Sequence, residues 1–469
     1  MPRSKASGMD DSERPKPERT PVEVLEANVT APTTELIDRS LIRGGALSAF
    51  GYRDFSLLWS GAFLSNVGTL IHTTALLWYI NQLTNSSAWV GAVNFANFLP
   101  IILFVLYAGS LADRLDRRKL ILWTQALMML VALLLGLAVS LGWIPPSTAT
   151  SATTGQLVLI MAITVFMGVA FVFNFPAWRA MVPDLVPNDL LLNAVALDAA
   201  GYNMARFIGP ALGALILNVW NVAGAFYINA ISFLAVIAAL LLIRYRPPES
   251  APPEESAWTQ MREGARYMWR NSWTRNLIFV LGISAFFGLS YIVLLPSVSK
   301  DVLHKGSWGY GFLLGAVGLG AAVGAPIVTL LNRRLKEREL IKYGLLIFSV
   351  MVLVLAASHA YWLSLAATFG MGLSFLTASA SINTVLQARV DRLMRGRVMS
   401  FYILLFQGTA PIGGLLFGYV ADVRSTSFAL LIGGLVVLAL ALVLIFVPSI
   451  LKDAVSPAMP PAAADGVTR

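Results

Sequence analysis

Long apolar runs constrain the fold of this chain more strongly than any other feature of its sequence. From about residue 55 onward, apolar runs follow one another, separated by shorter polar segments. Each run has about 20 residues, which at about 1.5 Å per residue in a helix is enough to cross the roughly 30 Å hydrocarbon layer of a bilayer. The runs lack the alternating pattern of barrel strands. The sequence therefore predicts an all-α integral membrane protein.

Twelve runs have this character. They are 55–80, 88–112, 119–142, 156–178, 190–217, 222–243, 276–298, 309–331, 341–358, 362–386, 398–421 and 427–449. A polar, proline-rich segment separates the sixth run from the seventh, which predicts two six-helix bundles. We expect these bundles to cover residues 51–245 and 276–450.

The remaining segments are polar. Residues 1–50 mix proline, charged and hydroxyl residues with little apolar periodicity, which is typical of a disordered tail. Residues 451–469 are predicted to be a second tail. Within the linker 246–275, apolar residues recur at helical spacing around Trp258 and Trp269, and Arg262, Arg266 and Arg270 follow one another at four-residue steps. This pattern predicts an amphipathic helix on the membrane surface, and a solvated linker helix would explain it equally well.

Composition and charge exclude several classes of protein. Only 13% of the residues are charged and 57% are hydrophobic, whereas soluble domains carry about 25% charged residues. The net charge is +9, but lysine and arginine gather in the loops after the even-numbered runs, and the other loops hold only Lys300, Lys305 and Arg424. The positive-inside rule then places both termini in the cytosol of a cell-membrane protein. Cations in alternate loops do not form a nucleic-acid-binding face.

Enzyme and cofactor chemistry is not expected either. The chain has no cysteine and three widely separated histidines, and it contains no phosphate-binding loop or hydrolase motif. We therefore expect no metal, no cofactor and no catalytic site.

A dense cluster of charges follows the second run. Gly109, Asp113, Arg114, Asp116, Arg117 and Arg118 lie within ten residues, between two spans. A carboxylate at the end of a span is stabilised when it pairs with arginine or caps the positive N-terminus of another helix. Asp113 is therefore predicted to be a gate residue that contacts the start of the eleventh span near Val398. A solvated acidic residue among loop cations is the alternative.

The fifth run carries a stripe of small residues. Gly201, Ala205, Gly209 and Gly213 recur at every fourth position, and Pro210 is expected to kink the helix. Small residues at this spacing allow a neighbouring membrane helix to approach closely. The stripe predicts helix packing.

These motifs resemble those of the major facilitator superfamily. The cluster after span two is similar to its gating motif, with Asp116 where many members carry glycine. Together with Phe175-Pro-Ala-Trp178, Ala205-Arg-Phe-Ile-Gly-Pro210 and Arg395-Gly-Arg-Val-Met-Ser400, it resembles the enterobactin-exporter-like branch of transmembrane secretion effectors. The resemblance implies a two-bundle fold and alternating access. The span-five stripe is also similar to a motif of antiporters, which implies efflux coupled to inward proton movement.

Three ionisable residues lie inside the predicted spans, where charge is costly and usually functional. Asp198 is the leading candidate for a proton carrier, although a structural bond between helices would explain it equally well. Arg206 could bind an anionic substrate or partner a carboxylate. His72 could titrate near neutral pH, and a hydrogen-bonded helix contact is the alternative.

The sequence thus predicts a secondary active transporter. A proton-driven exporter of a small amphiphilic molecule, such as a drug or a siderophore, fits the motifs best. An ion-coupled uptake symporter and a non-transporting membrane scaffold are the alternatives.

Overall fold

The computed structural model describes residues 45–146, 151–245, 257–331 and 334–451. A few side chains within these ranges, including those of Asp113 and Arg114, also lie outside the described part.

All the regular elements of the described chain are helices. The N-terminal half contains η2 (Ser48–Gly51), α3 (Arg53–Thr84), α4 (Ser87–Arg114), α5 (Arg117–Ser140), α6 (Thr154–Met181), η3 (Pro183–Leu185), η4 (Asn188–Leu190), α7 (Leu191–Val219) and α8 (Asn221–Leu242). The linker helix α9 (Ala257–Arg270) precedes the C-terminal half. That half contains α10 (Ser272–Ile283), η5 (Ser284–Gly288), α11 (Tyr291–Ser297), η6 (Val298–Val302), α12 (Gly306–Leu331), α13 (Glu337–Ala357), α14 (Tyr361–Arg389), α15 (Arg392–Val423), α16 (Thr426–Phe446) and η7 (Pro448–Leu451).

Twelve membrane-length segments arise from these elements in the described part of the chain, since α10 to η6 form one span. This confirms the predicted fold class. Ten of the twelve are long and apolar enough to cross a membrane by length and composition alone. The other two, α3 and α7, have 32 and 29 residues. Polar residues such as His72 and Asp198 lower their hydropathy.

Local signals in the sequence start several helices. Ser86, Asp116 and Ser425 accept hydrogen bonds from the first backbone amides of α4, α5 and α16. Thr153 and Gln156 form a reciprocal capping box at the start of α6. Such caps satisfy amides that would otherwise lack a partner.

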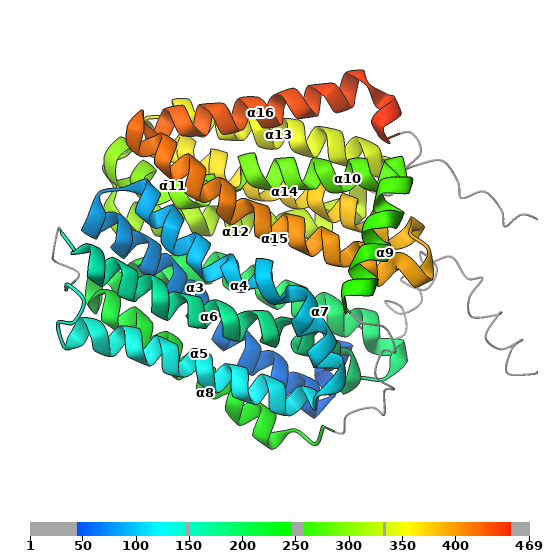
Figure 1. Ribbon diagram of the computed structural model, residues 1–469, viewed down its shortest axis with the longest axis horizontal. Helices are drawn as coiled ribbons and strands as arrows, with labels where there is room; N and C mark the ends of the chain where they lie inside the picture. Colours follow the sequence, from blue (N-terminus) through cyan, green and yellow to red (C-terminus); the bar gives the residue numbers. More distant parts are fainter. Residues whose placement is uncertain (1–44, 147–150, 246–256, 332–333, 452–469) are drawn as a thin grey trace, which may run out of the picture.

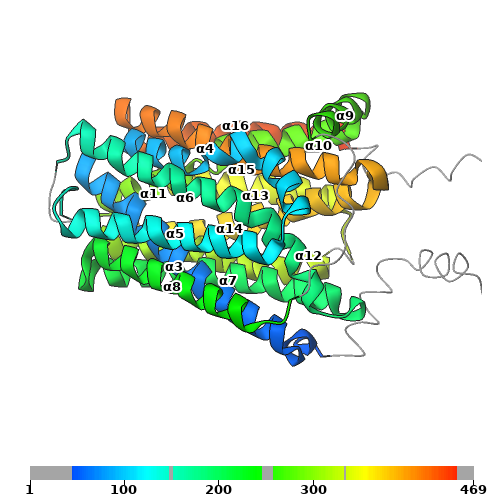
Figure 2. The same ribbon diagram turned by 60° about the horizontal axis from the view of Figure 1, so that its bottom comes forward.

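The two halves lie side by side as two bundles. Figure 1 shows the N-terminal half in the lower part and the C-terminal half in the upper part, with the long helices nearly parallel. The first and last described segments lie at the same end of the long axis (Figures 1 and 2). We call this end, which also holds the arginine-rich loops, the basic-loop end.

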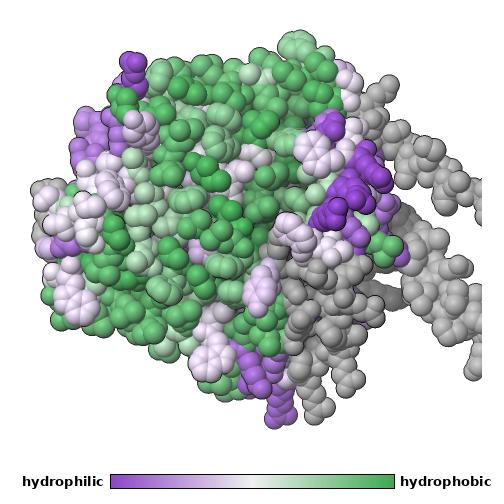
Figure 3. All heavy atoms as spheres, viewed as in Figure 1, coloured by the Kyte–Doolittle hydropathy of each residue, from purple (hydrophilic) through white to green (hydrophobic). Residues whose placement is uncertain are grey.

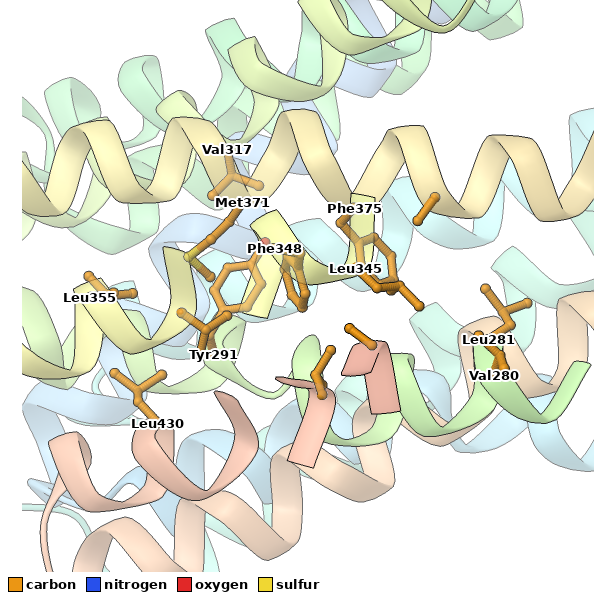
Figure 4. Close-up of a cluster of buried hydrophobic side chains, with 14 of the residues drawn as sticks. Val280, Leu281, Tyr291, Val317, Leu345, Phe348, Leu355, Met371, Phe375 and Leu430 are labelled. Atoms are coloured by element: carbon orange, nitrogen blue, oxygen red, sulfur yellow. The ribbon is translucent and has the colours of Figure 1, made fainter. Parts of the chain in front are cut away.

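The surface agrees with a membrane location. Figure 3 shows a broad hydrophobic band around the middle of the visible face, with hydrophilic side chains gathered towards the two ends of the long axis. The interior is apolar as well. In the C-terminal half, Phe348 packs between the rings of Tyr291 and Phe375, at centroid distances of 6.4 and 5.0 Å. Figure 4 shows this cluster beside Met371 and Val317.

Span seven departs from a regular α-helix at two places. The π-helical turns η5 and η6 interrupt it, so that α10 and α11 are shorter than the single helix predicted over 276–298. A π-turn accommodates an extra residue within a helix and is frequent at functional sites.

The boundary of the N-terminal tail also differs from the prediction. Residues 45–50 are described, and η2 packs against α7, where the Ala49 amide donates a hydrogen bond of 2.9 Å to Asn193 Oδ1. The sequence had no apolar periodicity here because a single turn is too short to show one. The other residues of the predicted tails lie outside the described part of the chain.

Candidate functional site

The small-residue stripe of α7 lies against α3. A Cβ added at Gly209 would lie 2.5 Å from the Cβ of Leu70, and one added at Gly213 would lie 3.2 Å from the carbonyl oxygen of Ile71. Gly201 lies against Trp59 in the same way, and Ala205 is fully buried. Pro210 lies buried inside the helix. The stripe therefore joins two helices of the same bundle.

Two glycines of α12 make a close contact with another side of α7. A Cβ added at Gly311 would lie 2.4 Å from the Cβ of Ala214, and one added at Gly318 would lie 2.2 Å from the carbonyl oxygen of Arg206. Because α7 and α12 belong to different bundles, this contact is part of the interface between the two halves.

The exposure of α7 changes along the line that faces α12. Ala214 and Pro210 are buried, Phe207 is exposed, Asn203 is half-buried, and Ala200 and Ala196 are exposed. All six residues lie within about 80° on one side of the helix, given 100° per residue. Between Ala214 and Ala196, this side of α7 is therefore less covered on the part nearer the basic-loop end.

The second contact between the halves joins α4 and α15. A Cβ added at Gly91 would lie 2.7 Å from the carbonyl oxygen of Gly414, and one added at Gly418 would lie 2.4 Å from that of Ser87. These glycines bring the two helices together near the start of α4.

A carboxylate from one bundle caps a helix of the other at this point. The carboxylate of Asp422, near the end of α15, accepts hydrogen bonds from Ser86 Oγ at 2.5 Å, from the Ser87 amide at 2.7 Å and from the Ala88 amide at 3.1 Å. We call these four residues the clasp. A negative charge at a helix N-terminus is stabilised by the free amides and by the helix dipole.

Further polar contacts reinforce the clasp. Ser297 in span seven bonds both Asn81 Nδ2 and Ser87 Oγ at 2.7 Å, and all three side chains are buried. Lys300 donates to Asn85 Oδ1 at 2.8 Å. Asn218 Nδ2 donates to Ser307 Oγ at 2.8 Å. These hydrogen bonds between the two bundles lie at one end of the molecule, which we call the clasp end.

The charge cluster after span two forms contacts inside the N-terminal bundle. Asp116 accepts from the amides of Arg118 and Lys119 at 3.0 and 3.3 Å, and so caps α5. Arg117 forms a 2.7 Å ion pair with Asp184, which follows α6. Arg118 donates to the Leu241 carbonyl oxygen at 3.3 Å. The side chains of Asp113 and Arg114 lie outside the described part, so their predicted gate contact stays a prediction.

Two more residues complete the surroundings of this cluster. The Tyr245 hydroxyl donates to Asp184 at 2.8 Å. Burial, together with the hydrogen bond to Asp184, raises the pKa of Tyr245 to about 12, so it remains a neutral donor at physiological pH. Gly109 has open space around its Cα: no neighbouring atom lies within 4 Å of an added Cβ.

Asp198 lies near the basic-loop end, among groups from several helices. It accepts a hydrogen bond of 3.3 Å from Trp178 Nε1, near the end of α6. Arg179 is close enough to interact electrostatically with Asp198 and with Tyr402 of the other bundle. Arg179 also lies over the ring of Phe175, 5.1 Å from its centroid. This arrangement places a carboxylate and an arginine beside the region between the bundles.

The other two ionisable candidates are placed separately. Arg206, in α7, forms no ion pair with a carboxylate among the described residues. His72 is buried inside the N-terminal bundle, 4.7 Å from the ring of Phe226, and its Nδ1 has no hydrogen-bond partner. Asp198, Arg206 and His72 are thus not brought together into one site.

Sequence reasoning missed Arg179 and the clasp. The groups near Arg179 are distant from it in sequence. The sequence therefore showed Arg179 only as one cation in the loop after span four. Asp422 is an acidic residue at the end of span eleven, just as Asp113 is one at the end of span two. That correspondence was the available signal.

Comparisons with known proteins agree with this architecture. Residues 44–463 match the family described as transmembrane secretion effector. The staphyloferrin A transporter of Staphylococcus aureus is 24% identical over 84% of this chain and 96% of its own length. Macrolide efflux protein A of Streptococcus pyogenes is 21% identical over 83% and 94%.

A solved structure shows the same fold. The crystal structure of the nucleoside transporter NupG covers 85% of this chain and 99% of its own, with a TM-score of 0.64 and 13% identity. The chain is therefore a multi-pass membrane transporter rather than an enzyme, and it belongs to the transmembrane secretion effector family of the major facilitator superfamily.

Proposed function

We propose that this transporter exports a small amphiphilic molecule, such as a drug or a siderophore, in exchange for protons. The asymmetric interface between the bundles supports the alternating access on which this proposal rests. A hydrogen-bonded clasp joins them at one end, whereas the α7 line that faces α12 becomes exposed towards the other end. Such an interface suits a protein that opens one end at a time.

The cations define the orientation that we propose. Loops rich in lysine and arginine stay on the cytosolic side of a membrane, so the basic-loop end and both termini are cytosolic, and the protein lies in the cell membrane. The clasp then closes the outer side. Asp113 at the end of span two is the proposed counterpart of Asp422 at the end of span eleven, and it closes the cytosolic side in the opposite state.

The polar residues near the bundle interface have proposed roles in transport. Asp198 carries the proton, because it is a carboxylate beside the region that opens to the cytosol. Arg206 contacts polar or anionic groups of the cargo, since it has no carboxylate partner among the described residues. The α7 stripe holds α7 against α3 while the interface changes. Macrolide efflux by one relative and siderophore transport by another support an amphiphilic cargo.

Energised inverted membrane vesicles test this proposal. Candidate macrolides, dyes and siderophores are screened for uptake into vesicles with an acidic interior, with and without an uncoupler that removes the proton gradient. We expect uptake of at least one compound, and its loss with the uncoupler. Vesicles from cells without the protein are the control.

Other outcomes identify the alternatives. Gradient-dependent accumulation in intact cells, rather than in inverted vesicles, would make the protein an uptake symporter. Uptake that persists with the uncoupler but requires sodium would show that sodium, and not the proton, is the coupling ion. No flux of any compound, in either orientation, would leave a non-transporting scaffold.

A further inference from the structure

The linker helix α9 is held against the C-terminal bundle along one side. A Cβ added at Gly264 would lie 3.0 Å from the Cβ of Arg397 in α15, and Met268 is buried. Glu263 forms an ion pair with Arg397. Burial and the charge of Asp391 raise the pKa of Tyr267, which lies beside the start of α15. These contacts with the C-terminal bundle therefore fix the position of α9.

The opposite side of α9 is largely exposed. Arg262, Arg266 and Arg270 are exposed, and none of them forms an ion pair with a described carboxylate. Trp258 and Trp269 are also exposed, by 70% and 58%. At 100° per residue these five side chains share about one third of the helix circumference. The apolar residues that the sequence placed on one face are thus divided: Met268 faces the protein, and the tryptophans face outward beside the arginines.

Contacts with span seven indicate at which depth of the bilayer the exposed side of α9 lies. The ring of Trp269 meets the ring of Phe279 in α10 at a centroid distance of 5.9 Å, and Phe279 is itself exposed on a membrane span. Arg275 lies over Trp269, 5.8 Å from the ring centroid. Figure 1 shows α9 lying across the long helices at their basic-loop end. Tryptophan next to lipid-facing residues is typical of the boundary between hydrocarbon and headgroups.

We propose that the exposed side of α9 binds the headgroups of anionic phospholipids. The three arginines lie at steps of about 6 Å along the helix, at the level where lipid phosphates lie, and arginine donates two parallel hydrogen bonds to a phosphate. Clusters of cations beside a membrane span attract anionic lipids. Figure 3 shows strongly hydrophilic side chains gathered at the basic-loop end, where Figure 1 places α9, next to the hydrophobic band.

Charge complementarity with an acidic protein or with RNA would not explain the two tryptophans. An indole ring placed next to a lipid-facing phenylalanine favours a membrane occupant, because one of its edges is apolar and its N–H is polar. The inference concerns lipid binding alone and does not depend on the direction or the coupling of transport.

Lipid retention by the purified full-length protein tests the proposal. Phosphatidylglycerol or phosphatidylcholine is added to the protein in neutral detergent micelles, and the bound lipids are counted by native mass spectrometry. We expect the variant R262Q/R266Q/R270Q to retain at least about five times less phosphatidylglycerol, as loss of several multidentate phosphate contacts implies, with no change for phosphatidylcholine. The variant R262K/R266K/R270K keeps the charges and should recover part of the binding.

The matched control is R244Q/R334Q/K336Q, which removes the same formal charge from exposed positions at the same end of the molecule. It should retain phosphatidylglycerol like the unaltered protein. Equal losses in both triple variants would mean nonspecific attraction to net charge and would overturn the site on α9. Unchanged retention in the α9 variant would do the same, and so would arginine-dependent capture of RNA or an acidic protein without any loss of phosphatidylglycerol.

Discussion

At the residue scale, Asp198 is the carboxylate that we propose carries the coupled proton. It accepts a hydrogen bond from the indole N–H of Trp178, and the charge of Arg179 lies nearby. Trp178 and Asp198 were each visible in the sequence, but their contact was not, since it depends on how α6 and α7 pack.

We expect Asp198→Asn to abolish proton-driven accumulation of cargo, down to the level of vesicles without the protein. The amide keeps the shape and can still accept from Trp178, but it cannot take up a proton. Binding of cargo to the purified variant should persist, as measured by fluorescence or calorimetry. The control is Asp189→Asn, an exposed carboxylate just before the same helix, which should leave uptake unchanged. If the Asp198→Asn variant still concentrates cargo with the same pH dependence, Asp198 is structural.

At the scale of elements, the sequence predicted more about helices than about their contacts. Apolar runs identified the twelve spans because the bilayer requires long helices with satisfied backbones. Small residues at every fourth position predicted that α7 packs closely, and the structure supplies α3 as its partner. The π-turns of span seven left no signal, because a single inserted residue does not alter an apolar run. Periodicity alone could not tell that Trp258 and Trp269 of α9 face outward while Met268 faces the protein.

The stripe of α7 makes a sharp prediction about packing. Gly209→Ala should lower the free energy of unfolding by about 1–3 kcal/mol, as extra methyl groups do in well-packed cores, because the new Cβ would lie 2.5 Å from that of Leu70. Thermal unfolding in detergent measures the effect. Gly396→Ala is the control, since no atom lies within 4 Å of an added Cβ there. Equal midpoints for the two variants would mean that α3 and α7 separate easily.

At the scale of the whole molecule, the distribution of cations predicts the orientation in the membrane. The chain has no native cysteine, so single cysteines can be introduced without a background. Ser151→Cys, in the loop before α6, should react with an impermeant thiol reagent in intact cells. Ser272→Cys, at the start of α10, should react only after the cells are opened. The reverse pattern would invert the proposed topology, and with it the proposed direction of each gate.

The clasp gives the whole molecule a lock whose two partners lie far apart in the sequence. Asp422 and Ser86 are separated by 336 positions, and only the packing of α4 against α15 brings them together. A charge at a helix N-terminus contributes about 0.3–1 kcal/mol, and up to about 2 kcal/mol when partly buried. Since about 1.4 kcal/mol changes an equilibrium constant tenfold, loss of this contact can redistribute two states of similar free energy.

We therefore expect Asp422→Asn to open the clasp end. Spin labels at Leu141→Cys and Trp362→Cys, exposed positions of the two bundles at this end, should move to longer distances in pulsed dipolar spectra. Labels at Arg244→Cys and Arg334→Cys, at the basic-loop end, should move to shorter ones, because alternating access closes one end as the other opens. The control is Asp301→Asn, which removes a carboxylate from the same end but not from the clasp. Distances at both ends that match the unaltered protein would show that the backbone contacts of Gly91 and Gly418 hold the bundles together without Asp422.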